Sequence, residues 1–186
     1  MHNQALRLIE QSREYRDLKL KVIGRFLRRW KINPNQLTFL SLVSGIGAIY
    51  FLFSHFGYFV LFALLHVMFD GLDGVVARLG TPSSYGSYLD IGVDSFITIL
   101  LIVKIGYYIN DFYPFIIAGL FTLAVLIHMV TKFEAPILFM RSVGLILVGI
   151  SMLVSFQTGF LIVSYLIGGI ATAYSLAKQV QYFTQQ

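Results

Sequence analysis

The chain has 186 residues, of which 57% are hydrophobic and only 12% are charged. Soluble domains use about 25% charged residues, so the mean hydropathy of +0.76 indicates a protein that lies largely in lipid. The sequence has no cysteine, which excludes disulfides, thiolate metal sites and thiol catalysis.

The net charge of +5 is concentrated near the N-terminus, where nine of the fourteen Lys and Arg lie between Arg7 and Lys31. Apolar residues recur near helical spacing through residues 6–30, which predicts an amphipathic surface helix. Because this basic stretch runs directly into a hydrophobic segment, it favours an anionic membrane surface as its partner, and no nucleic acid is expected. We expect a surface element over residues 1–32 and one membrane domain over residues 33–186.

Six apolar segments follow, each long enough for a transmembrane helix of roughly 20 residues. We place them at 36–54, 58–79, 86–108, 113–132, 136–156 and 158–179. The predicted fold is therefore an all-α integral membrane protein with six transmembrane helices, preceded by the amphipathic juxtamembrane helix. Short connections imply that consecutive segments are antiparallel neighbours.

The distribution of Lys and Arg predicts the orientation of these segments. Arg78, Lys132 and Arg141 lie near the connections on one side, whereas the connections on the other side have no Lys or Arg. The positive-inside rule then places both termini in the cytoplasm. Lys104 lies near the opposite end of the third segment, and we expect its long side chain to reach the interface.

Four aspartates lie within the second and third segments: Asp70, Asp73, Asp90 and Asp94. An ionised side chain at mid-bilayer costs roughly 2.5–3.5 kcal/mol, so such residues persist with water, partners or a metal, and usually for function. Each pair has helical spacing and lies near the connecting loop, so the four carboxylates can converge at one depth. A hard divalent cation, Mg²⁺ or Mn²⁺, would offset their repulsion, and two ions could fit.

The four acids are also compatible with roles that involve no metal. The carboxylates could pair with basic side chains, or they could line the cation or proton pathway of a small transporter. The small residues Gly74, Ala77 and Gly86 could serve close helix packing. Beside four acids, they could instead leave room for a phosphate, which Arg78 could clamp.

Eight residues within 25 positions form a longer string across these two segments. It reads Asp70-x2-Asp73-Gly74-x2-Ala77-Arg78-x7-Gly86-x3-Asp90-x3-Asp94. The string resembles the signature of the CDP-alcohol phosphatidyltransferase family, although the gap between Arg78 and Gly86 is one residue shorter than is usual. The six-segment layout and the basic N-terminal helix also fit, so the resemblance covers nearly the whole chain.

The resemblance implies phospholipid biosynthesis: transfer of a phosphatidyl-type group from CDP-diacylglycerol or a CDP-archaeol-like lipid to an alcohol, with release of CMP. It implies that Asp70, Asp73 and Asp90 hold Mg²⁺ or Mn²⁺, with Asp94 at their edge as the catalytic general base. The CDP-lipid-binding residues that it implies are Asn35, Thr38, Gly74, Ala77, Arg78 and Ser83. It further implies a homodimer, and we expect a multi-pass protein of a prokaryotic cell membrane with a cytoplasmic active site.

The alcohol acceptor is less constrained. Lys132 and Arg141 could bind an anionic acceptor, and basic residues there resemble family members that use inositol phosphate or a similar polyol phosphate. They could equally be interfacial anchors. Glycerol phosphate and serine remain alternatives. His66, one turn before Asp70, is expected to be a buried histidine with its hydrogen bonds satisfied.

An intramembrane prenyltransferase is a further enzymatic alternative, because it also binds magnesium pyrophosphate with paired aspartate motifs. Such motifs usually have Asn before the first Asp, where this chain has Phe69. These proteins also need more spans than 186 residues provide.

Overall fold

The computed structural model describes residues 23–80 and 84–185. All regular structure in these two ranges is helical, which confirms the predicted all-α fold. Residues 23–29 are helical, and the rest of the predicted surface helix lies almost entirely outside the described residues. The labelled helices are α2 (Pro34–Phe51), α3 (Phe56–Arg78), α4 (Ser84–Ile109), α5 (Tyr113–Val130), α6 (Arg141–Ser151) and α7 (Gln157–Thr184).

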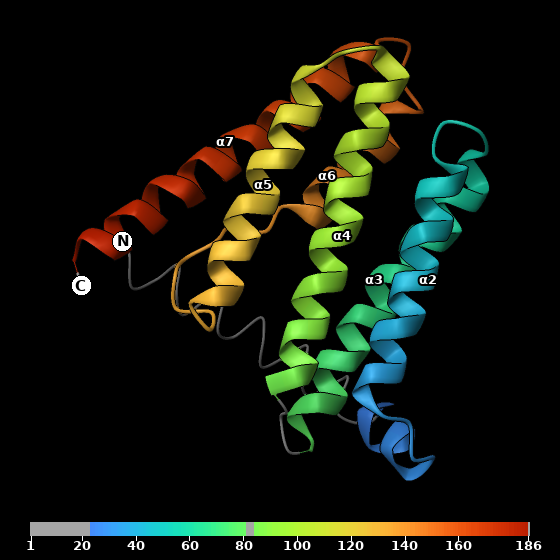
Figure 1. Cartoon of the computed structure of the whole chain (residues 1–186). Helices are drawn as coiled ribbons and strands as arrows, with labels where there is room; N and C mark the ends of the chain where they lie inside the picture. The colour runs from blue at the N-terminus through green and yellow to red at the C-terminus, as the bar shows by residue number, and fades with distance from the viewer. Residues whose placement is uncertain (1–22, 81–83, 186) are drawn as a thin grey trace, which may run out of the picture.

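Helix α2 packs against both α3 and α4, and α4 joins this group to the C-terminal helices (Figure 1). Helix α4 contacts α5 and α6, and α7 packs against both of these helices. A core of buried apolar side chains, which includes Ala48, Phe59, Leu101 and Leu161, joins the two groups. The start of α2, the end of α3 and the start of α4 therefore meet at one end of the molecule.

The start of α2 is defined by its first residues. Pro34 occupies the first turn. Backbone N–H groups there have no acceptor within the helix, so proline loses no hydrogen bond, and its fixed φ suits a helix. The Gln36 side chain accepts a hydrogen bond from the backbone N–H of Asn33 at 2.9 Å. These local interactions fix where the chain enters the helix group that carries the aspartates.

Three helices, α3, α5 and α7, are long and apolar enough to cross a membrane, which supports the prediction of a membrane protein. Helix α4 has 26 residues, but Asp90, Asp94 and Lys104 reduce its mean hydropathy. The count of six spans stays a prediction.

The predicted fifth segment, 136–156, is wrong in its first part, because residues 136–140 are not helical and α6 has only 11 residues. Pro136 has no N–H and disfavours helix in the residue before it. The backbone N–H of Leu138 instead donates to Ser175 Oγ at 2.9 Å. Arg141 is therefore the first residue of α6, and it is buried in the interior of the protein.

Lys104 contacts the end of a neighbouring helix. Its ammonium donates to the backbone carbonyls of Ile49 and Tyr50, at 2.5 and 3.0 Å. These carbonyls belong to the last turn of α2, where they lack partners within the helix. A cation placed there satisfies them and interacts favourably with the helix dipole. Lys104 thus fastens α4 to the end of α2 that lies far from the aspartates.

We expect Lys104→Met to lower the free energy of unfolding by about 1–2 kcal/mol, because two carbonyls lose a charged donor. Thermal or SDS-induced unfolding of the purified protein measures the change. Lys178→Met is the matched control, since the Lys178 ammonium contacts Gln181 and Tyr174 of its own helix. Equal losses in the two variants would contradict the capping role.

Candidate active site

Three of the four aspartates, one from α3 and two from α4, bring their carboxylates close together. One carboxylate oxygen from each of Asp70, Asp90 and Asp94 lies within 4.8 Å of the others, and all three residues are partly buried. Oxygen ligands that share a divalent ion at 2.0–2.6 Å are at most about 5 Å apart. We call these three residues the aspartate cluster. Its spacing and its oxygen donors fit a hard cation such as Mg²⁺ or Mn²⁺.

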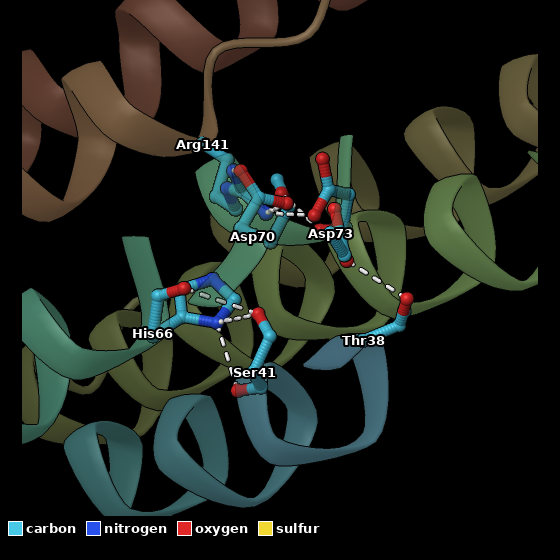
Figure 2. A network of polar contacts seen from close by, with 8 residues as sticks. Thr38, Ser41, His66, Asp70, Asp73 and Arg141 are labelled. Atoms are coloured by element: carbon cyan, nitrogen blue, oxygen red, sulfur yellow. Dashed lines mark hydrogen bonds and ion pairs between the residues drawn. The ribbon is translucent and has the colours of Figure 1, made fainter. Parts of the chain in front are cut away.

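Asp73 faces a different neighbour. Its Oδ2 accepts a hydrogen bond from Thr38 Oγ1 at 2.8 Å (Figure 2), and only 4% of the residue is exposed. The predicted convergence therefore holds for three aspartates, while the fourth is engaged by α2. Asp73 is nevertheless part of the same site, because it lines the cavity beside the cluster.

That cavity has a volume of about 350 Å³ and lies between the beginnings of α2 and α4 and the end of α3. Four of the residues expected to bind the CDP-lipid line it: Asn35, Thr38, Gly74 and Ala77. Asn33, Gln36 and Ser87 add polar groups to the wall. These three residues were not predicted, because they are not fixed positions of the motif, although polar residues in the first turns of two helices could have suggested them.

Two further residues, Arg78 and Ser83, were expected at the nucleotide site. Arg78 is exposed at the end of α3, and a Cβ built on Gly74 would lie 3.4 Å from its Nη1. The guanidinium therefore lies next to the glycine at the edge of the cavity. Ser83 falls outside the described residues.

Asp90 connects the cavity with the cluster. It is the residue that both lines the cavity and contributes an oxygen to the cluster. A pyrophosphate in the cavity would therefore lie beside any ion that the cluster holds. This arrangement suits the transfer of a group that is attached through phosphate.

Arg141, the first residue of α6, reaches the cluster from the side of the C-terminal helices. Its Nη1 and Nη2 donate to Asp70 Oδ1 and Oδ2 at 3.0 and 2.5 Å (Figure 2). The same guanidinium contacts Asp94 Oδ1, and only 7% of the residue is exposed. The sequence placed Arg141 near an acceptor, and the structure places it directly on two of the aspartates.

A model of the CDP-alcohol phosphatidyltransferase family matches residues 31–176. The chain belongs to this family. The matched residues include the whole aspartate cluster, the cavity and Arg141, so the resemblance of the motif is confirmed over most of the chain. A comparison with individual curated proteins returns no match.

Membership of the CDP-alcohol phosphatidyltransferase family makes the protein a phosphotransferase of phospholipid biosynthesis. Its substrates are a CDP-alcohol and an alcohol acceptor. The family is generally metal-dependent, and the aspartate cluster supplies a suitable set of oxygen donors. The transporter and prenyltransferase alternatives therefore lose their basis.

In this CDP-alcohol phosphatidyltransferase, two polar contacts tie α2 to the helix that carries the first aspartate pair (Figure 2). One is the bond from Thr38 to Asp73. In the other, His66 Nδ1 lies 2.8 Å from Ser41 Oγ and 2.9 Å from the Ser41 carbonyl oxygen. A carbonyl only accepts, so Nδ1 carries the proton. His66 is fully buried, as expected, but Nε2 has no hydrogen-bond partner among the described residues.

Lys132 is the other basic residue that was expected to bind the acceptor. It is exposed just after α5, where its backbone φ is 53°. Of the two basic residues expected to bind the acceptor, Arg141 is therefore the one that contacts the aspartate cluster.

Proposed function

We propose that this enzyme transfers a phosphatidyl-type group from CDP-diacylglycerol, or from a CDP-linked ether lipid, to a polyol phosphate such as inositol phosphate. Mg²⁺ or Mn²⁺ supports the reaction, and CMP is released. The observation that carries the proposal is the position of Asp90, which belongs both to the cavity and to the aspartate cluster. A nucleotide in the cavity then has its phosphates next to the carboxylates.

The residues that would hold the metal are Asp70, Asp90 and Asp94, with Asp73 across the cavity wall as the ligand of a second ion. When bound, the ions offset the charge on the pyrophosphate and on the departing CMP. All four carboxylates come from α3 and α4, and both of these helices pack against α2, so the arrangement of the three helices sets the geometry of the donors.

The chain's own residues bind and orient the substrates. The cavity wall formed by Asn35, Thr38, Gly74 and Ala77 accommodates the cytidine and its phosphates, and Arg78 lies at the edge to meet a phosphate. Asp94 removes the proton from the acceptor hydroxyl. The acceptor oxygen then forms a bond to the lipid-side phosphorus, while the bond from that phosphorus to the CMP oxygen breaks.

Arg141 supports an acceptor that carries a phosphate. A guanidinium presents a rigid fork of donors that matches phosphate or carboxylate oxygens. Arg141 stands at the first position of α6, where the free backbone N–H groups also favour an anion. Serine has no phosphate for these groups to bind, and glycerol phosphate remains the second candidate because it shares this chemistry. Lys132 is proposed as a further, outer contact.

The proposed orientation follows from the same chemistry, and the proposed assembly follows from the family resemblance. CDP and a polyol phosphate are soluble in water, so we place the open end of the cavity at the cytoplasmic surface, together with both termini. Six membrane crossings, a homodimer and a prokaryotic cell membrane complete the proposal.

Release of CMP from a CDP-lipid tests this function directly. With inositol phosphate and Mg²⁺, we expect the purified protein in detergent to release CMP and to form a lipid that carries the polyol phosphate. EDTA should stop the release and added Mg²⁺ should restore it. Glycerol 3-phosphate, free inositol and serine form the comparison panel. Release with serine alone would refute the phosphorylated acceptor, and no release with any alcohol would refute the transferase function.

A further inference from the structure

Arg141 occupies both oxygen atoms of one carboxylate in the aspartate cluster. Both oxygens of Asp70 accept hydrogen bonds from it, and it also contacts Asp94 Oδ1. The cluster offers one oxygen each from Asp70, Asp90 and Asp94. An ion held by all three residues would therefore have to share an oxygen of Asp70 with Arg141 or displace the guanidinium, and at Asp94 it would lie close to the same guanidinium.

The surroundings make sharing unfavourable. The Arg141 side chain is 8% exposed, and the side chains of Asp70 and Asp94 are 21% and 23% exposed, so little water screens the charges. A guanidinium keeps its proton in proteins, so its positive charge cannot be removed when another cation arrives. Two cations at contact distance repel strongly where screening is weak.

The same burial explains why some cation must be present. Carboxylates that are removed from water without a partner are strongly destabilising. Arg141 provides two hydrogen bonds in the planar, bidentate geometry that suits a carboxylate. It therefore meets the electrostatic need of Asp70 and Asp94 from the side of α6.

We propose that Arg141 takes the place of the metal: its guanidinium pairs with Asp70 and Asp94 when no divalent ion is bound and releases them when the ion binds. The inference rests on the metal site of the proposed function. Asp90 is the residue of the aspartate cluster that lines the cavity, so an ion that arrives from the cavity meets this carboxylate of the cluster first. Binding then replaces the guanidinium at the other two.

The exchange has a consequence for the order of binding. The guanidinium that the ion displaces becomes available to an anion on the acceptor side of the cluster. The metal therefore binds first, and the anionic acceptor binds to the released Arg141. Metal affinity is lowered by the need to break the arginine pairs.

Metal binding to Arg141→Met in detergent, after removal of metal with EDTA, tests the exchange without any substrate. We expect the variant to bind Mn²⁺ about tenfold more tightly or better by isothermal titration. We also expect its metal-free form to melt at a lower temperature than the wild type, with a larger stabilisation by Mn²⁺. Lys178→Met removes one positive charge from an exposed helix end and should match the wild type in both measurements. Equal or weaker Mn²⁺ binding by Arg141→Met would overturn the exchange.

A second measurement uses the wild-type protein, in case the variant does not fold. Phenylglyoxal modifies free guanidinium groups, and peptide mass analysis reports the modified fraction at Arg141. We expect this fraction to rise several-fold when Mn²⁺ replaces EDTA, and an unchanged fraction would overturn the proposal.

The two proposals can fail separately. A protein that binds Mn²⁺ and exposes Arg141, but releases no CMP, would refute the proposed function alone. A protein that releases CMP with Mg²⁺ but keeps Arg141 protected would refute the exchange alone. A protein that binds no Mn²⁺ would overturn the exchange as well as the proposed metal site.

Discussion

Asp94→Asn is expected to lower turnover by about 10²–10⁴-fold, the usual contribution of a positioned general base, while the CDP-lipid still binds. Asparagine has nearly the same shape as aspartate but cannot take up the proton of the acceptor hydroxyl. The described cavity wall contains Asp73 and Asp90 rather than Asp94, so the nucleotide contacts should survive. Single-turnover release of CMP and equilibrium binding of the CDP-lipid measure the two effects.

The comparison variant for this experiment is Asp70→Asn. Asp70 and Asp94 both contribute to the aspartate cluster and both contact Arg141, so the two variants share the loss of one carboxylate charge. Only Asp94 is proposed to act on the acceptor. An equal loss of CDP-lipid binding in both variants would contradict a separate role for Asp94 as the base.

Asp90→Asn is expected to lose Mn²⁺ binding, CDP-lipid binding and turnover together. The metal contributes several kcal/mol to stabilising the transition state, so we expect turnover to fall by about 10³-fold or more. The reason is the shared position of Asp90, whose carboxylate serves both the cluster and the cavity. Isothermal titration with Mn²⁺, followed by titration with the CDP-lipid, separates the two kinds of binding.

Ser87→Ala is the matched control, because Ser87 lies one turn before Asp90 on the same helix and lines the same cavity. It removes one hydroxyl and no charge, so CDP-lipid binding should weaken by less than about tenfold and Mn²⁺ binding should stay unchanged. Wild-type Mn²⁺ affinity in Asp90→Asn would contradict the dual role of this carboxylate.

Helical spacing predicted most of the aspartate cluster correctly. Asp90 and Asp94 are four residues apart and therefore lie nearly one above the other on α4. Asp70 and Asp73 are three residues apart, which separates their directions by about 60° around the helix axis. That angle lets Asp70 meet α4 and α6 while Asp73 meets Thr38 of α2. The position of α2 decides that Asp73, and not Asp70, meets this helix. The spacing of the aspartates along α3 does not predict this.

The position of Arg141 could not be predicted from hydropathy. The apolar run of residues 136–156 looks continuous, and composition does not show that its backbone finds partners elsewhere. The N–H of Leu138 bonds to Ser175, 37 residues later. Contacts at such separations depend on the completed packing of the helices. The late start of the helix, at Arg141 rather than at residue 136, is what brings Arg141 to the carboxylates, and Pro136 was the local signal for it.

The site is built from two parts of the chain, which meet at the first residue of the short helix α6. Helices α2, α3 and α4 supply the cavity and every carboxylate of the cluster, whereas the C-terminal helices reach the cluster through Arg141 at the tip of α6. If Arg141 binds the acceptor as proposed, substitutions around that tip that keep Arg141 would reshape the acceptor side while the nucleotide wall stays in place. Under the proposed function, the choice of head group could therefore diverge while the reaction chemistry is retained, and exchanging the segment between α5 and α6 is the experiment that would redesign the acceptor preference.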